Sequence, residues 1–241
     1  MNSSPANNSS NFFSWKGIVL QQDERVLKVG TDALLLATWL PTLIKNPKNI
    51  LDVGTGSGIL ALLMAQSFED SFIVAIDPDE HAVQLARINT GKSNFKNRIR
   101  VDQTGLFEYE TSTDQKFDLI ISNPPFYVNH ILPAQGAMQT AKHAASSPAD
   151  WMSALTHLVD KQAYLCLVLP TMVTFEWIRE ANNNQLFCNS RMDFFSFPED
   201  KQAKRSLLCF NHVLDTPNLS RMVMYKSKKN YTMEYATWLG I

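Results

Sequence analysis

The sequence predicts an α/β fold built on a mostly parallel seven-stranded sheet, with helices on both faces and an antiparallel edge strand. Three observations support this prediction. Short apolar runs, typical of strands buried on both faces, alternate with helical segments. A glycine-rich turn at 54–58 follows the first run, and the run Phe117–Ser122 stops at two prolines, Pro124 and Pro125. Strands that alternate with helices favour parallel pairing, because each crossover helix covers a face of the sheet.

The segment before the sheet, Phe12–Val29, alternates loosely, so we expect a hairpin with its turn near Asp23 and Glu24. A helix is expected over 33–40, capped by a side-chain oxygen of Thr31 or Asp32. A loop over 41–48 follows. The later strands are expected over 49–53, 72–77, 99–103, 117–122, 163–170, 192–197 and 206–212, and the later helices over 59–68, 80–89, 151–159 and 175–182. The last two strands lie close enough in sequence to pair antiparallel at an edge.

The chain of 241 residues is long enough for one large domain. Residues 1–11 are rich in Asn and Ser and predict a disordered tail, without the order of a signal peptide. Residues 12–241 are expected to form a single domain. Within it, 12–29 is the N-terminal hairpin, 30–213 the catalytic core and 214–241 a C-terminal extension.

Composition narrows the class of protein. The hydrophobic share is 45% and the charged share 19%, as in globular proteins, and no apolar run has membrane-spanning length. The net charge of -1 gives no overall attraction to nucleic acid, so an RNA site must be a local basic patch. Lys204 and Arg205, with Lys201 and the lysines at 226–229, are candidates, although such runs are more often a solvated face. Three widely spaced cysteines favour a reducing, cytoplasmic location and no structural metal.

A ligand site is predicted at the glycine turn. The spacing G-x-G-x-G at Gly54, Gly56 and Gly58, with Thr55 between, differs from the G-x-G-x-x-G of dinucleotide loops. It suits a ligand without pyrophosphate, because the turn crowds the helix N-terminus where phosphate would bind. Asp77 ends the next strand, where a carboxylate can accept hydrogen bonds from both ribose hydroxyls. S-adenosylmethionine fits these features, and Asp52 or an aromatic ring can offset its sulfonium charge.

A second candidate site is the elbow Asn123-Pro124-Pro125-Phe126, followed by Tyr127. It lies at the carboxyl end of a central strand, where open α/β sheets bind ligands. The Asn123 side-chain oxygen, the carbonyl before Pro124 and two aromatic rings match a planar amino group on an aromatic base. From these letters alone, a proline-stopped strand with Phe126 in the core is an equally good interpretation.

The glycine turn, Asp77 and the Asn-Pro-Pro-Phe elbow, in this order, resemble the class I S-adenosylmethionine-dependent methyltransferases that modify planar nitrogen, whose fold is Rossmann-like. More narrowly, Lys28–Asp32, Asn-Pro-Pro-Phe and the pair Lys142-His143 resemble the bacterial tRNA1(Val) (adenine-N6)-methyltransferases. The resemblance implies S-adenosylmethionine as cofactor and tRNA as partner; no metal is expected, because the sequence shows no Asp and His constellation that would bind one. It also implies that Thr31 and Asp32 form part of the cofactor pocket.

The resemblance implies a role for each site residue. Asn123, Pro124 and Phe126 are expected to be catalytic, with Asn123 accepting from the adenine amine. Phe126 and Tyr127 would stack on a splayed base. Lys142 and His143 are further expected to contact the substrate, although an ordinary polar residue is the favoured interpretation of His143. Lys204 and Arg205 are expected to contact it as part of the basic patch. The related enzymes often carry an acid after the third strand; here Gly105 stands there, so Thr104 is the expected substitute.

Other functions remain open at this stage. The same elbow chemistry serves an rRNA or DNA base, or a glutamine in a protein. A nicotinamide-dependent oxidoreductase is disfavoured by the glycine spacing. A non-catalytic binding module is disfavoured because Asn123 and Asp77 are both present.

Overall fold

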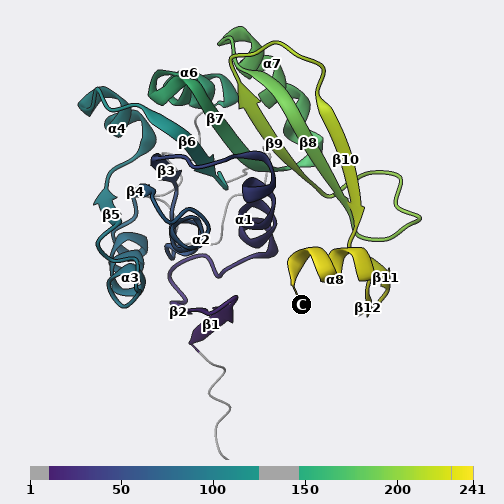
Figure 1. Ribbon diagram of the computed structural model, residues 1–241, viewed down its shortest axis with the longest axis horizontal. Coiled ribbons are helices and arrows are strands. Elements are labelled where there is room, and N and C mark those ends of the chain that lie inside the picture. The colour runs from purple at the N-terminus through teal and green to yellow at the C-terminus, as the bar shows by residue number, and fades with distance from the viewer. Residues whose placement is uncertain (1–10, 125–146, 229, 241) are drawn as a thin grey trace, which may run out of the picture.

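A central sheet organises the computed structural model, which describes residues 11–124, 147–228 and 230–240 (Figure 1). Among these residues the sheet has eight strands in the order β10-β8-β9-β7-β6-β3-β4-β5. Their bounds are β3 (Asn49–Val53), β4 (Phe72–Asp77), β5 (Ile99–Gln103), β6 (Phe117–Ser122), β7 (Val159–Pro170), β8 (Phe187–Phe195), β9 (Arg205–Asn211) and β10 (Asn218–Val223). Almost all of the expected N-terminal tail lies outside the described residues.

Strand directions confirm the predicted fold class and correct two details. The strands β5, β4, β3, β6 and β7 are parallel, and β9 runs antiparallel to both β7 and β8. The antiparallel strand therefore lies inside the sheet and not at its edge. The edge is β10, which pairs parallel to β8 and makes an eighth strand from residues expected in the C-terminal extension. Its residues are mostly exposed, so it lacks the apolar pattern that announces a strand.

Helices cover both faces of the sheet and bury two separate cores (Figure 1). One face carries α1 (Thr31–Leu43), α2 (Ile59–Ser67), α3 (Glu80–Gly91) and the C-terminal α8 (Met233–Leu239). The other face carries α4 (Leu106–Ser112), α6 (Pro148–Leu158) and α7 (Thr174–Asn183), with the short 3-10 turn η1 (Thr171–Val173) before α7. Strands between two cores must be apolar on both faces, which explains their continuous hydrophobic runs. None of the described helices is long and apolar enough to cross a membrane.

The N-terminal hairpin is present, but its predicted turn was wrong. Strands β1 (Phe12–Trp15) and β2 (Ile18–Gln21) pair across a turn at Lys16 and Gly17, not at Asp23. Both turn residues have positive φ, 46° and 80°, as two-residue hairpins require, and Gly17 supplies this at little cost. Asn89 of α3 holds β2 in place by exchanging hydrogen bonds of 2.8 and 3.0 Å with the Gln21 backbone.

Helix α1 also differs from its prediction. It begins at Thr31 and ends at Leu43, so it contains Pro41 and part of the expected loop. Its N-cap is Gly30, and neither Thr31 nor Asp32 caps it with a side chain. The Asp32 carboxylate instead accepts a hydrogen bond from Arg205 on β9, 2.7 Å away. Asp32 thus forms a long-range ion pair in place of the expected local cap, and this ion pair links α1 to β9 in the other half of the sheet.

Candidate active site

A cavity of about 840 Å³ opens at the carboxyl ends of the parallel strands. That volume lies within the range of roughly 300–1,000 Å³ usual for small-molecule sites. Its walls come from the glycine turn after β3, the ends of β4 and β6, the segment after β5, and the approach to α1. Among the residues predicted for the site, those lining the cavity are Asp32, Gly54, Thr55, Gly56, Asp77, Thr104, Asn123, Pro124 and Arg205.

The glycine turn has the backbone geometry that only glycine adopts easily. Gly54, Gly56 and Gly58 have φ of 75°, 56° and 84°. The amides of Gly54 and Thr55 both donate to the carbonyl of Ile76, at 2.9 and 3.0 Å. Gly58 does not line the cavity. A Cβ there would lie 3.4 Å from the Ala86 backbone, so Gly58 serves the close packing of the turn against α3.

Asp52 lies behind the turn, fully buried, and is not part of the cavity lining. Its Oδ2 accepts hydrogen bonds from the Thr55 hydroxyl at 2.6 Å and the Ala61 amide at 3.1 Å. Burial raises the pKa of Asp52 to about 7. The carboxylate therefore shapes the glycine turn and the start of α2, and the prediction that it offsets a sulfonium charge by lining the site is not met.

Asp77 faces the cavity from the end of β4. Its Oδ2 accepts from the Gly56 amide at 2.9 Å, and its Oδ1 accepts from the Asp79 amide at 3.0 Å. These bonds fix the carboxylate and leave each oxygen a further lone pair. Burial raises the pKa of Asp77, and the two backbone donors oppose that shift. A fixed carboxylate with spare lone pairs is well arranged to accept from neighbouring hydroxyls.

Asn123 and Pro124 form the cavity wall at the end of β6. The strand is tied to its neighbour β3 just before this point, because the Ser122 hydroxyl donates to the Val53 carbonyl at 2.8 Å. Within the described part of the chain the Asn123 side chain makes no hydrogen bond. The predicted residues Phe126, Tyr127, Lys142 and His143 lie outside the described residues.

Another part of the wall carries the ion pair between Asp32 and Arg205, residues that are 173 positions apart in sequence. Their neighbours Thr31 and Lys204 are exposed and do not line the cavity. Thr104 does line it, and its amide donates to the Asp77 carbonyl at 3.1 Å.

Sequence reasoning missed two parts of the wall. The segment 24–27 lines the cavity from the side of the N-terminal hairpin, just before the Lys28–Asp32 stretch, and no local pattern marks it. The rings of Phe107 and Trp151 meet edge to face, with centroids 6.5 Å apart, at the side formed by α4 and α6. The capping box of Ser147 and Asp150 fixes the start of α6 and thus the position of Trp151, and it could have been recognised in the sequence.

Comparison with known proteins identifies the family to which the chain belongs. The family described as "Methyltransferase small domain" matches residues 24–147. Curated tRNA1(Val) (adenine(37)-N6)-methyltransferases are similar over nearly the whole chain. The protein from Actinobacillus succinogenes is 31% identical over 94% of both chains, and that from Salmonella typhi is 31% identical over 93% of this chain and 91% of its own. The chain belongs to this methyltransferase family.

Solved structures agree on the fold of this methyltransferase. A predicted O-methyltransferase from Agrobacterium tumefaciens superimposes with a TM-score of 0.66 at 17% identity, covering 87% of this chain and 95% of that one. A methyltransferase from Pyrococcus furiosus has a TM-score of 0.58 at 18% identity, over 81% and 89% of the two chains. At these identities the likeness concerns the fold alone.

The methyl donor of the family is S-adenosylmethionine, and the residues of this cavity fit it. The Asp77 carboxylate is fixed with free lone pairs, as a ribose diol requires. The turn 54–58 carries no basic side chain that would favour a pyrophosphate. The described residues contain no cluster of three or more His, Cys, Asp or Glu arranged to hold a metal ion.

Proposed function

We propose that this methyltransferase modifies N6 of adenine 37 in tRNA1(Val). The curated relatives that match more than nine-tenths of the chain carry this activity in their names. The observation that carries the proposal is the joint position of Asn123 and Asp77, which line one cavity from the ends of β6 and β4, the two strands on either side of β3. One residue is suited to an amine and the other to a ribose.

The cofactor would be held by residues at the ends of β3, β4 and β5. Asp77 would accept from its ribose hydroxyls, and the turn Gly54–Gly56 would allow its close approach. Thr104 and the segment that follows it would lie along the adenine. When bound, S-adenosylmethionine supplies an electrophilic methyl group on a cationic sulfur.

Asn123 would prepare the acceptor. The exocyclic amine of adenine is a weak nucleophile because its lone pair is delocalised into the ring. Asn123 Oδ1 and the backbone carbonyl before Pro124 would accept its two N–H bonds and direct the lone pair away from the ring plane. Pro124 keeps this carbonyl fixed, because proline restricts the residue before it to an extended backbone. The rate enhancement would come from positioning and from fixed dipoles, without a strong base, and the surplus proton of the methylated amine would leave to water after the transfer.

The proposal is tested with tritiated S-adenosylmethionine and unmodified tRNA1(Val) transcripts. We expect label in the wild-type transcript, N6-methyladenosine as the labelled nucleoside, and no label when adenine 37 is replaced by guanine. Equal labelling of both transcripts would place the acceptor elsewhere, and label in a protein fraction but in no RNA would refute the proposal.

A further inference from the structure

A row of four aromatic rings lies at the C-terminal end of the chain, outside the cavity. Phe197 and Tyr225 have ring centroids 5.7 Å apart, Tyr225 and Tyr231 stack at 5.1 Å with 24° between their planes, and Tyr231 and Tyr235 lie 5.2 Å apart. Tyr235 is buried, whereas Tyr231 is 45% exposed. We call these four residues the tyrosine platform. The row thus connects a buried ring, Tyr235, to an exposed residue, Tyr231.

Hydrogen bonds donated by backbone amides hold the platform in a fixed position. The hairpin of β11 (Tyr225–Ser227) and β12 (Asn230–Tyr231) continues from β10, and the amides of Met224 and Tyr225 donate to carbonyls at the end of β8, at 2.8 and 2.9 Å. The hydroxyl of Thr232 accepts from the Tyr235 amide and caps α8. The Asp200 carboxylate accepts from the Ser196 and Phe197 amides and fixes the other end of the row. The rings are therefore preorganised for contact.

Lysines flank the exposed rings. Lys226 and Lys228 project from the hairpin, and Lys201 and Lys204 from the connection between β8 and β9; all four are exposed. Among the described residues none of these four forms a salt bridge, in a protein whose net charge is only -1. Arg221 of β10 adds a fifth cation, stacked over the Phe195 ring at 4.5 Å. Stacking rings bordered by unpaired cations are the combination that single-stranded nucleic acid recognises.

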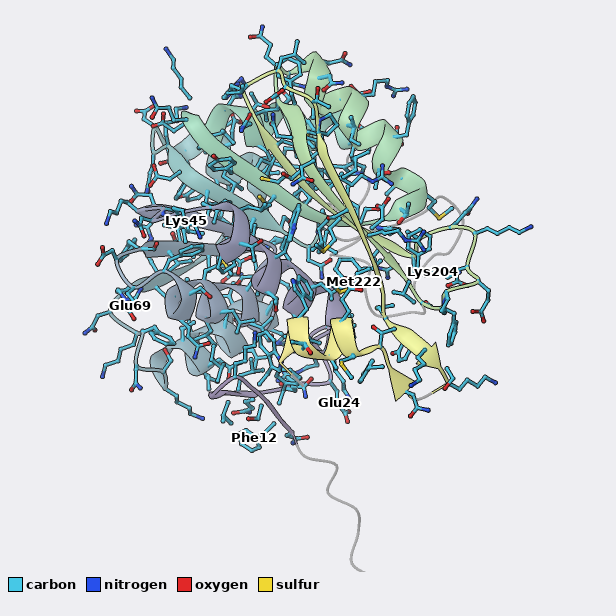
Figure 2. All side chains as sticks on the ribbon, turned by 45° about the vertical axis from the view of Figure 1, so that its right-hand side comes forward. Phe12, Glu24, Lys45, Glu69, Lys204 and Met222 are labelled. Carbon is cyan, nitrogen blue, oxygen red and sulfur yellow. The ribbon has the colours of Figure 1, made fainter. Side chains whose placement is uncertain are left out.

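The platform lies at the carboxyl ends of the parallel strands, as the active site does. Because β8 is parallel to β6, the end of β8 that leads to Phe197 faces the same way as the end of β6 that leads to Asn123. Arg205, at the start of β9, joins the two regions through its bond to Asp32 in the cavity wall. Figure 2 shows Lys204 on the side of the C-terminal hairpin, whereas Lys45 lies across the molecule. The two places therefore lie at the same end of the parallel strands.

We propose that the tyrosine platform docks unpaired nucleotides of the RNA substrate beside the target adenine, with a base stacked on Tyr231 and phosphates on Lys226 and Lys228. This inference rests on the proposed function, since it assigns that substrate a second contact outside the cavity. The occupant is a single strand, because a base paired in a helix does not offer its face to a tyrosine ring.

The test measures KM and kcat for tRNA1(Val) methylation together with direct binding of the fluorescein-labelled transcript. Tyr231→Ala should raise KM and Kd roughly tenfold with kcat unchanged, from the loss of one stacked base. Tyr231→Phe, which keeps the ring, should stay within about twofold of wild type, since stacking needs only the aromatic face. The double variant Lys226→Glu/Lys228→Glu should weaken binding at least tenfold and lower the slope of log K against log salt by about 1.4 or more.

The matched control is Lys45→Glu/Lys161→Glu, which makes the same charge change at the amino ends of the parallel strands, away from the active site. Unchanged KM in the lysine double variant, or equal losses in it and in the control, would overturn the inference even if Tyr231→Ala misfolds. The two proposals fail separately. If wild type methylates no tRNA, the proposed function falls, while transcript binding by the same variants still decides whether the platform docks RNA.

Discussion

Replacement of Asp77 by asparagine should separate cofactor affinity from fold stability. Asp77 lines the cavity, and its carboxylate has two oxygens, each fixed by one backbone amide and each with a spare lone pair. A hydrogen bond to a charged acceptor contributes about 1 kcal/mol more than one to a neutral acceptor. Loss of the charge against two ribose hydroxyls therefore predicts about 2–3 kcal/mol, or a rise of roughly 30–150-fold in the Kd for S-adenosylmethionine.

Stability should change much less than affinity in Asp77→Asn. Burial raises the pKa of Asp77, so the free protein loses stability by keeping this group ionised, and a neutral amide removes that cost. The amide in turn leaves one backbone N–H without an acceptor, which offsets the gain. We expect the Tm of the free protein to stay within a few degrees of wild type.

Calorimetric titration with S-adenosylmethionine and thermal unfolding of the free protein make the measurement. Asp79→Asn is the matched control, because Asp79 lines the same cavity, loses the same charge, and remains an equally good helix cap as asparagine. We expect Asp79→Asn to change the Kd less than threefold. The assignment of Asp77 to the ribose would be refuted if both variants changed the Kd equally, or if Asp77→Asn bound the cofactor as wild type does.

Three further predictions concern Asp77 in the cavity wall and two residues that do not line the cavity, Asp52 and Gly58. Because a ribose donates to the ionised form of Asp77, affinity for S-adenosylmethionine should fall as pH decreases through the raised pKa, and titrations of Asp77→Asn should show no such fall. The pKa of Asp52 is about 7 in the fold and near 3.8 when unfolded, so its contribution to stability, on the order of 4 kcal/mol, is present below pH 4 and is lost as pH rises to 7. In urea unfolding, the free energy of unfolding of Asp52→Asn should therefore rise relative to that of wild type between pH 4 and pH 7. A difference that stays constant over this range would contradict the raised pKa. Gly58→Ala should lower the free energy of unfolding by about 1–2 kcal/mol, because residue 58 has a left-handed backbone, and should lower the Tm by several degrees. Gly91 has open space around it and no positive φ, so Gly91→Ala should not destabilise the protein. Equal melting temperatures for the two variants would contradict the backbone strain expected at residue 58.

The strands that position the site could be read from the sequence because burial on both faces leaves an unbroken apolar run. The bounds of β3, β4 and β5 are those expected, and Asp77 and Asn123 follow from where two such runs end. The exposed strand β10 and the short helix α4 have too few buried residues to produce a pattern.

Other parts of the site depend on contacts that no local pattern encodes. The pair Asp32–Arg205 joins segments from opposite ends of the chain, so its place in the wall emerges only from the folded sheet. The glycine turn identified the ligand site, but it could not show that Asp52 acts from behind the turn and that Gly58 packs against α3. Spacing places a residue near a site; burial and partners decide which of its atoms the ligand can reach.

The kinetics of Asn123→Ala test the central claim most directly. The account predicts that methyl transfer to tRNA1(Val) falls at least 10³-fold in kcat, on the order of 4 kcal/mol of transition-state stabilisation, while the Kd for S-adenosylmethionine stays within about twofold. Transfer at a rate within tenfold of wild type would contradict the account, because the adenine amine would then be prepared by some other group.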